Sequence, residues 1–332
     1  MPRRAQISRR AVASLGIARD DNVRVLFWGT PDFATPALRA LIGEGFDVAA
    51  VVTQPDRPVG RSRSVLEPPP VKRIALEESI PVLQPEKPRG DDFVDQLRAL
   101  APDISVVVAY GHILSQTIID LPRLGTINIH ASLLPALRGA APIQAAIREG
   151  RAETGVTIMR MVKALDAGPS IVQVKTPIPD DETYGELQLR LAEMGALALI
   201  EALALIDLGA AVETPQSDAD ATYASKVDRS MTRVDWNADA RTVAQVIRAY
   251  DPRPGAFALG SAGEVKLFGA RVASSTGDGE PGRVLAVDDA GMTIACRTGA
   301  VLIGAVHPAG KRRISPVEWA RGRGIVAAER LS

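Results

Sequence analysis

Short, uninterrupted runs of apolar residues alternate with helix-like stretches from residue 23 to about residue 208, and this alternation constrains the fold most strongly. The run VRVLFWG (23–29) leads into a helical stretch at 33–44, and the run DVAAVVT (47–53) follows it. Strands without polar alternation are buried on both faces, and a helix after each strand supplies the cover. The pattern therefore predicts an α/β fold with a doubly wound, mostly parallel sheet.

The same pattern continues toward the middle of the chain. The further elements that it predicts are a helix at 91–100, strands at 104–110 and 125–130, a later pair of strands at 154–161 and 170–178, and a long helix at about 182–208.

The texture of the sequence changes after Gly209. The stretch 209–230 is small, polar and weakly periodic, which predicts a linker that crosses a surface. Beyond a helix near 238–250, short apolar runs with frequent glycine predict a small β-barrel or a sandwich. The expected organisation is an extension (1–21), a first domain (22–208), a linker (209–229) and a small β-barrel domain (230–326).

Charge and cysteine content exclude several classes of function. Acidic and basic residues balance at 39 each, so a nucleic-acid partner would need a local basic patch. The single cysteine, Cys296, excludes an internal disulfide framework and a cysteine-rich metal site. The three histidines (His112, His130 and His307) lack metal-ligand spacing, so no metal is predicted. No window approaches the roughly 20 apolar residues of a membrane span.

The first 21 residues hold five arginines before the first acidic residue, Asp20, and are expected to be disordered. They lack the continuous apolar core of a secretory signal. Two interpretations stay open, a leader segment of a bacterial protein or an organellar transit peptide. The expected location is the cytoplasm in the first case and an organellar matrix in the second.

An asparagine and a histidine end one predicted strand. Asn128 and His130 are two residues apart and share a face at the carboxyl end, where open α/β sheets bind ligands. Such a pair can stabilise an oxyanion and move a proton, although a hydrogen-bonded structural histidine is the alternative. Asp166, in LDAG (165–168), could orient the imidazole or simply form a turn. Sequence spacing alone does not join Asp166 to His130.

Seven segments resemble, in order, the methionyl-tRNA formyltransferase family. They are GTPDFA (29–34), VVTQPDRPVGR (51–61), VVVAYGHIL (106–114), INIHASLLP (127–135), RGAAPIQ (138–144), ETGVTIM (153–159) and LDAG (165–168). The Asn-His-SLLP-Asp set marks the wider group of 10-formyltetrahydrofolate-dependent formyltransferases. QPDRPVGR and RGAAPIQ, with DPRPGAF and PAGKRR in the second domain, point more narrowly to the enzymes that act on tRNA. The similarity covers about residues 22–325.

This resemblance implies a Rossmann-like formyltransferase fold followed by an OB-like barrel. It implies transfer of the formyl group of 10-formyltetrahydrofolate to the α-amino group of methionine on initiator tRNA, for translation initiation, without a metal. The catalytic residues that it implies are Asn128, His130 and Asp166. The folate-binding residues that it implies are Tyr110, Gly111, Leu114, Ser132, Leu133, Leu134 and Pro135. A cytoplasmic monomer is expected.

Two basic segments gain a use from the resemblance. Residues 53–73 hold five basic residues against two acidic ones, with five prolines, which predicts an exposed loop. By composition alone this would be a solvated loop, whereas the resemblance implies a reader of the tRNA acceptor stem, with Arg61 as its main contact. The last thirty residues hold six basic residues against two acidic ones. The tRNA-binding residues implied are Arg61, Arg63, Lys72, Arg73, Arg138, Lys311, Arg312 and Arg313.

Three segments depart from the family pattern. Ala136-Leu137 stand where two bulky residues are usual, ALDAGP (164–169) replaces the usual GLDTGD, and Arg253 replaces a tryptophan. None of these removes a matched catalytic residue. Two other functions stay open, a formyltransferase for a small amine (an amino sugar or a purine precursor) and a catalytically silent tRNA-binding protein.

Overall fold

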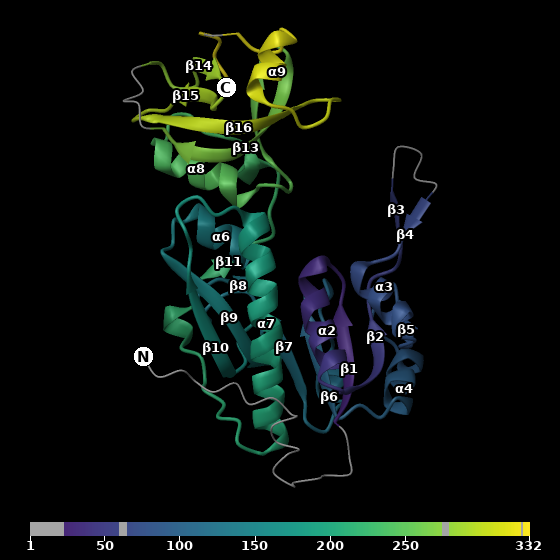
Figure 1. Ribbon diagram of the computed structural model, residues 1–332. Coiled ribbons are helices and arrows are strands. Elements are labelled where there is room, and N and C mark those ends of the chain that lie inside the picture. Colours follow the sequence, from purple (N-terminus) through teal and green to yellow (C-terminus); the bar gives the residue numbers. More distant parts are fainter. Residues whose placement is uncertain (1–22, 60–64, 274–278, 327) are drawn as a thin grey trace. The chain divides into compact units, whose positions relative to one another are not determined.

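The computed structural model describes residues 23–59, 65–273, 279–326 and 328–332 (Figure 1). The amino-terminal extension and residues 60–64, with Arg61 and Arg63, lie outside the described residues. The chain forms two compact units. The amino-terminal unit takes in the chain up to Arg138 with 155–175 and 189–222; the carboxyl-terminal unit takes in 139–154, 176–188 and the chain from Tyr223 onward. The domain limits 22–208, 209–229 and 230–326 stay predictions.

A seven-stranded sheet organises the amino-terminal unit, in the order β10-β9-β7-β6-β1-β2-β5. Its strands are β1 (Arg24–Gly29), β2 (Asp47–Val52), β5 (Val82–Leu83), β6 (Ile104–Val108), β7 (Thr126–His130), β9 (Glu153–Arg160) and β10 (Ser170–Pro177). The five strands from β5 to β7 pair in parallel, whereas β9 pairs antiparallel with β7. This order confirms the predicted mostly parallel sheet.

The interior strand β1 shows why the apolar runs become strands. Leu26 and Trp28 point to one face, where they pack with Leu97 and Ile118. These two residues come from helices that follow β5 and β6 in the chain. A buried side chain of this size contributes about 1.5–3 kcal/mol relative to an exposed one, so the runs are stable only when helices cover them. The helices associated with this unit are α2 (Thr35–Gly43), α3 (Pro70–Glu77), α4 (Asp91–Ala99), α5 (Gln116–Ile119) and α7 (Tyr184–Asp207), with the 3-10 turn η1 (Asp32–Ala34).

The expected exposed loop at 53–73 is wrong in part. Two short strands, β3 (Arg57–Val59) and β4 (Val65–Glu67), pair antiparallel and extend away from the sheet (Figure 1). Helix α3 then begins at Pro70. Proline is tolerated at the first helical position because its missing N–H would have no partner there, so the proline run starts a helix rather than prolonging a loop. The apolar face of α3, Val71, Ile74 and Ala75, is buried.

A five-stranded antiparallel sheet organises the carboxyl-terminal unit, in the order β12-β13-β16-β15-β14. Its elements are β12 (Ala256–Gly260), β13 (Gly263–Val272), β14 (Val284–Asp288), β15 (Gly291–Ala295), β16 (Ala300–Pro308), α8 (Ala240–Ala249) and α9 (Pro316–Arg321). The last residues bridge its two outer strands. Ser332 exchanges two backbone hydrogen bonds with Leu259 of β12, while Ala328 and Glu329 bond to Val284 of β14. The last residues of the chain are therefore hydrogen-bonded to both outer strands of this sheet, β12 and β14.

The predicted linker is tied to the segment after β7. The remaining short elements are β8 (Arg138–Gly139), α6 (Pro142–Arg148), η2 (Asp218–Asp220), β11 (Tyr223–Ala224) and η3 (Ser230–Thr232). β8 and β11 form a two-stranded sheet, so part of the predicted linker 209–229 is ordered and paired with the segment after β7.

Among the described residues, no helix is both long enough and apolar enough to span a membrane.

Candidate active site

His130 and Asp166 meet at the carboxyl edge of the sheet. His130 is the last residue of β7, and Asp166 lies in the connection between β9 and β10. The distance from His130 Nδ1 to Asp166 Oδ2 is 3.6 Å, and the two side chains are only 6% and 12% exposed. The structure therefore joins two residues whose proximity the sequence spacing left open.

The other ring nitrogen of His130 fixes the ring's orientation. His130 Nε2 lies 2.9 Å from the carbonyl oxygen of Leu137. A carbonyl oxygen can only accept, so Nε2 carries a proton and donates. Nδ1 is thereby left to face Asp166 and any reacting atoms. The 3.6 Å separation exceeds an ordinary hydrogen bond, as is common in catalytic sites before substrate binds.

Asn128 shares the face of His130. Trp28, Val107 and Asn128 are in register across β1, β6 and β7, so the amide projects on the face that α4 and α5 cover. Its Oδ1 position is buried and has no hydrogen-bond partner among the described residues. An unsatisfied buried polar group costs about 1–3 kcal/mol. A half-turn of the amide places its NH₂ group at the same position, so the site is chemically suited to a polar ligand atom.

The SLLP segment is held by hydrogen bonds of its own. Ser132 Oγ donates to the carbonyl oxygen of Ala136 at 2.6 Å, and the backbone N–H of Leu134 donates to Thr157 Oγ1 at 3.1 Å. Thr157 in turn donates to the Ser132 carbonyl at 2.7 Å. Both Ser132 and Leu134 are buried. Hydrogen bonds therefore hold the backbone of the predicted folate segment up to Ala136, the residue that precedes Leu137.

The Ala136-Leu137 departure now has a structural meaning. Leu137 is 2% exposed and has a positive φ of 59°, a conformation that a residue with a Cβ adopts at a cost. Its N–H donates to Thr222 Oγ1 at 2.9 Å, and its carbonyl receives the His130 hydrogen bond. Leu137 thus supports the ring of His130 through its backbone, which does not depend on the identity of its side chain.

Tyr110 and Leu114 lie deeper than the sequence suggests. Both belong to the apolar cluster around Trp28, whose ring meets that of Tyr110 edge-to-face at 5.2 Å. Burial raises the pKa of the Tyr110 hydroxyl to about 12. The carbonyl oxygen of Tyr110 accepts from Thr30 and Gln54, and Gly111 follows with a φ of 91°. The side chains of Tyr110 and Leu114 are therefore part of the core, and both lone pairs of the Tyr110 carbonyl oxygen are engaged within the protein.

Three exposed apolar side chains lie in the segments that follow β6 and β9, and sequence reasoning missed them. Ile113 follows β6 and is 90% exposed. Val162 and Leu165, in the segment that carries Asp166, are 39% and 59% exposed. Exposed apolar groups that gather beside convergent polar ones are typical of a ligand site.

The basic residues of the amino-terminal unit differ in exposure. Lys72 Nζ is 2.8 Å from Asp56 Oδ2 and 2.7 Å from Gln84 Oε1, and its side chain is only 19% exposed. The hydrogen bond from Gln84, followed by that from Lys72, holds the pKa of Asp56 below its usual value. Arg73 is exposed. Lys72 therefore holds Asp56, the residue before β3, and its ammonium group is less exposed to solvent than an exposed loop would predict.

Arg138 is buried, at 3% exposure. Its Nε donates to Gln216 Oε1 at 3.0 Å, and its Nη1 pairs with Asp218 at 2.8 Å. A guanidinium enclosed in this way cannot reach a nucleic-acid phosphate without breaking both contacts. These contacts give Arg138 a structural role, and its contact with tRNA stays a prediction.

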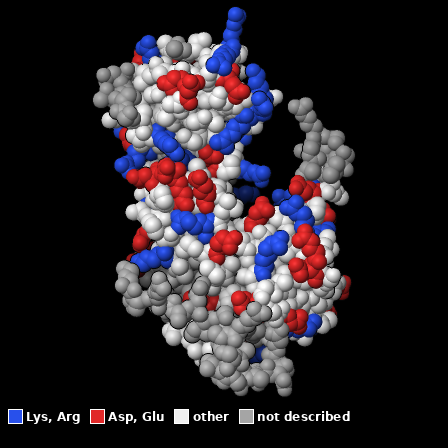
Figure 2. Space-filling view, in the orientation of Figure 1, with Lys and Arg blue, Asp and Glu red and all other residues white. Residues whose placement is uncertain are grey.

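The basic residues near the end of the chain are exposed. Lys311 and Arg312 follow β16, and Arg312 lies 3.9 Å from Glu318. Arg313 is more restrained, because it contacts buried Asp251 at 3.4 Å and stacks 4.1 Å above the ring of Phe268. Figure 2 shows acidic and basic side chains interspersed over the face in view, with a run of basic ones along one side of the carboxyl-terminal unit.

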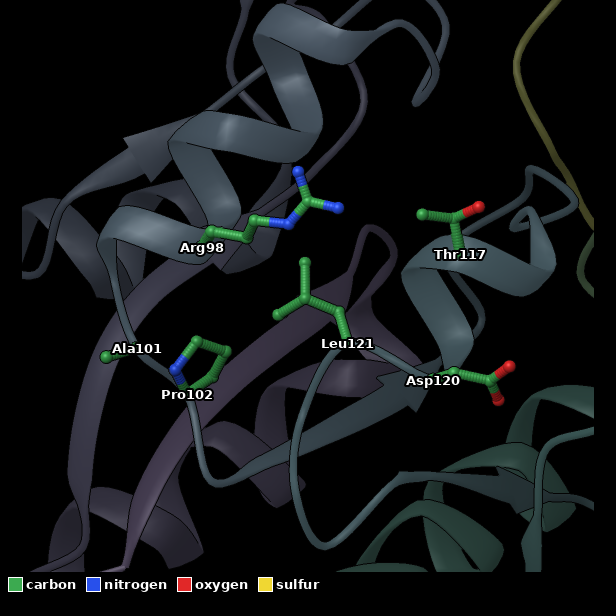
Figure 3. Close-up of a pocket in the computed structure, with 6 residues that line it drawn as sticks. All are labelled: Arg98, Ala101, Pro102, Thr117, Asp120 and Leu121. Carbon is green, nitrogen blue, oxygen red and sulfur yellow. The ribbon is translucent and has the colours of Figure 1, made fainter.

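Two cavities lie in the amino-terminal unit. One, of about 360 Å³, lies beside Pro102, just before β6 begins and thus at the opposite edge of the sheet from His130. Its lining residues are Arg98, Ala101, Pro102, Thr117, Asp120 and Leu121 (Figure 3). The other, of about 320 Å³, lies between the Leu134–Pro135 backbone, β10 and residues 214–217.

In the described part of the chain, no three His, Cys, Asp or Glu side chains are grouped to hold a metal ion.

Comparison with known proteins identifies the family. A formyl transferase family matches residues 21–203, and the formyl transferase C-terminal domain family matches residues 226–324. The methionyl-tRNA formyltransferase of Moorella thermoacetica is 45% identical over 309 residues, covering 93% of this chain and 99% of the relative. The chain belongs to the methionyl-tRNA formyltransferase family. A second relative of that name, from Aromatoleum aromaticum, is 46% identical over 93% of this chain and 97% of its own length.

Solved structures of other proteins resemble this member of the methionyl-tRNA formyltransferase family in fold. HypX from Aquifex aeolicus, solved with tetrahydrofolic acid, has a TM-score of 0.64 at 22% identity, over 90% of this chain and 47% of that chain. WlaRD, a sugar 3N-formyl transferase, has a TM-score of 0.65 at 17% identity, over 88% and 100%. These likenesses confirm the predicted formyltransferase fold.

Proposed function

We propose that this protein transfers the formyl group of 10-formyltetrahydrofolate to the α-amino group of methionine on initiator tRNA. The observation that carries the proposal is the convergence of Asn128, His130 and Asp166 at the carboxyl edge of the sheet, in a chain of this family. The product would be N-formylmethionyl-tRNA for translation initiation. A cytoplasmic location and a monomeric state follow as further expectations.

The chemistry requires a nucleophilic amine and stabilisation of a transient oxyanion. The amine nitrogen attacks the formyl carbon, a new C–N bond forms, and the bond from the formyl carbon to N10 breaks. The amine loses one proton and N10 gains one, so the reaction needs no external oxidant or reductant. The protein has to stabilise negative charge on the formyl oxygen and to guide the proton.

Each of the three residues has a distinct part in this proposal. The Asn128 amide and the Nδ1–H of His130 donate to the developing oxyanion, since Nε2 is engaged by Leu137. Asp166 faces Nδ1, orients the ring and stabilises its protonated form. Asp166 also receives the proton of the amine through water. No nucleophilic side chain is required, because the amine attacks the formyl group directly.

The folate is proposed to lie along the carboxyl edge. Ile113 and Leu165, the neighbour of Asp166, supply exposed apolar surface for its ring system. The backbones at Tyr110, Gly111 and Leu114 and at Ser132, Leu133, Leu134 and Pro135 supply polar groups and the shape of the site. The free Oδ1 position of Asn128 fits a polar atom of the donor.

The tRNA is proposed to contact the β3–β4 segment and the chain after β16. Arg73, Lys311 and Arg312 are exposed and basic, and Arg61 and Arg63 stand between β3 and β4 in the sequence. Phosphate contacts of this kind set the register of a tRNA, while the shape of its acceptor end carries discrimination. Arg313 contributes through the exposed part of its stacked guanidinium.

A comparison of acceptors tests the proposal. The purified protein and 10-formyltetrahydrofolate are incubated with initiator Met-tRNA and, in parallel, with an amino sugar nucleotide and a purine-precursor amine. Rapid formylation of Met-tRNA alone is the expected result. Transfer to a small amine alone would assign the site to a different formyltransferase. Binding of tRNA without transfer to any amine would instead identify a silent tRNA-binding protein.

A further inference from the structure

A glutamine from the predicted linker holds the segment that carries Asp166. Gln216 Nε2 donates to the carbonyl oxygen of Asp166 at 2.8 Å and to that of Gly168 at 2.7 Å. Its Oε1 accepts from Nε of buried Arg138 at 3.0 Å. One amide group therefore connects the segment of Asp166 to the segment that follows the folate-binding loop.

The same stretch of chain also holds the support of His130. Thr222 Oγ1 accepts from the N–H of Leu137, whose carbonyl oxygen receives the hydrogen bond of His130. The Thr222 carbonyl oxygen accepts from the N–H of Arg138 at 2.8 Å. Residues 216–222 therefore contact both backbone segments on which the geometry of the His130–Asp166 pair depends.

The segment around Asp166 needs an external restraint. Asp166 has a φ of 48°, in the left-handed region that non-glycine residues adopt only when their surroundings enforce it. Gly168 is packed so closely that a Cβ atom there would lie 1.9 Å from the carbonyl oxygen of Arg160. The two hydrogen bonds from Gln216 bind the carbonyls of these two residues. They are the side-chain contacts best placed to maintain this conformation.

We propose that Gln216 is a positioning residue for formyl transfer, acting through Asp166 on His130. Because it rests on the roles proposed above for those two residues, this inference fails if they fail. Gln216 itself contacts neither reacting group. Its loss should lower kcat while leaving substrate binding intact, since the β3–β4 segment, residues 311–313 and the apolar side chains at 113, 162 and 165 lie outside its contacts.

Two substitutions separate the contacts of Gln216. Gln216→Glu keeps an acceptor for Arg138 but removes both donated hydrogen bonds, and Gln216→Met removes all three with little change in shape. Gln245→Glu makes the same change of charge at another half-buried glutamine, in α8, and is the control. We expect both Gln216 variants to lose 10- to 100-fold in kcat, with KM for Met-tRNA changed less than threefold. Gln245→Glu should match the parent.

A spectroscopic signal and a double variant complete the test. With only three histidines in the chain, the ring signals of His130 can be resolved by NMR, and they should move in the Gln216 variants while those of His307 stay. Asp166→Asn with Gln216→Glu should be no slower than Asp166→Asn alone, since both act through one group. Parent-like kcat in both folded Gln216 variants, or a change confined to KM, would overturn the inference while leaving Asp166 in place. Parent-like kcat in Asp166→Asn would overturn the proposed roles and this inference with them.

Discussion

The Nε2 atom of His130 donates to the carbonyl oxygen of Leu137, 2.9 Å away, and this contact commits the ring to one orientation. The Leu137 backbone is itself restrained by Thr222 and has a left-handed φ. The orientation of the His130 ring therefore depends on the backbone of a neighbouring segment. The only ring nitrogen that can serve the reacting atoms is Nδ1, which Asp166 faces.

Replacing His130 with alanine should lower the rate of formylation by about 10²–10³, since that is the typical effect of removing one oxyanion donor. Binding of tRNA and folate should persist, because the proposed binding groups lie elsewhere. Single-turnover formylation of Met-tRNA and equilibrium titration of each substrate measure the two effects. His307→Ala, in β16, is the control and should keep the parent rate. A near-normal rate for His130→Ala would exclude the proposed role.

The pair at the end of β7 could be predicted from residue spacing, whereas Asp166 was linked to it only through the family resemblance and Gln216 was not predicted at all. Period-two alternation places Asn128 and His130 on one face of any strand, whatever surrounds it. Asp166 joins them only because β9 runs back beside β7 and its connection to β10 returns to the same edge. Gln216 is harder still to predict, because its bonds go to backbone carbonyls 48 and 50 residues away. By composition, the segment that holds Gln216 cannot be told from an ordinary polar linker.

Replacing Gly168 with alanine should distort the Asp166 segment. The new Cβ would lie 1.9 Å from the Arg160 carbonyl oxygen, and backbone rather than a mobile side chain would have to move. We expect a loss of about 1–3 kcal/mol in the free energy of unfolding, and a fall in kcat larger than the fall in stability explains. Denaturant unfolding and steady-state kinetics measure the two quantities.

Gly43→Ala is the matched control for that substitution. Gly43 ends helix α2, and a Cβ there meets no atom within 4 Å. Alanine should leave activity unchanged and stabilise the protein by up to about 1 kcal/mol. Equal stability and activity of Gly168→Ala and the parent would show that the Asp166 segment adapts freely.

The overall fold could be predicted where burial dictates the sequence pattern. The prediction failed where prolines and charged residues are dense. The apolar runs at β1, β2, β6 and β7 have no other stable environment than a covered sheet. Strand β5 has only two residues, both half-buried, and leaves no periodic signal. Helix α3 begins inside the run Pro68–Pro70, and its basic residues Lys72 and Arg73 suggested a solvated loop. Proline is favoured at the first position of a helix, so Pro70 was a signal for a helix start, which the polar composition of the segment outweighed.

Lys72 and Arg73 are neighbours with different expected functions, and alanine at each position separates them. Lys72→Ala should leave Asp56 and Gln84 without their shared partner and destabilise the protein by about 1–2 kcal/mol. Arg73→Ala should change stability by less than about 0.5 kcal/mol. If Arg73 contacts a phosphate, its removal should also reduce the slope of log affinity against log salt by about 1. Thermal unfolding and tRNA titration over a salt series measure these effects. Unchanged stability in Lys72→Ala would contradict the bracing role.

The only cysteine provides a pH-dependent test of the carboxyl-terminal unit. Cys296 is 1% exposed, and burial, reinforced by the charge of Asp239, raises the pKa of its thiol to about 11. At pH 8 about one thiol in a thousand is then ionised, roughly a hundredfold less than for a free cysteine. Alkylation of the native protein should be correspondingly slow, and denaturant should release one fast-reacting thiol per chain. Fast alkylation of the native protein at pH 8 would show that this core opens readily.

The same raised pKa predicts a loss of stability in alkali. The unfolded thiol ionises near pH 9, before the folded one does, so the unfolded state loses its proton first. The stabilising effect of the neutral thiol is therefore complete below about pH 9 and declines as the pH rises toward 11, by at most about 3 kcal/mol. Denaturant unfolding of the parent and of Cys296→Ala at pH 8, 9.5 and 10.5 isolates this effect. The difference between the two should shrink with rising pH, because alanine cannot ionise; a constant difference would mean that the thiol ionises equally in both states.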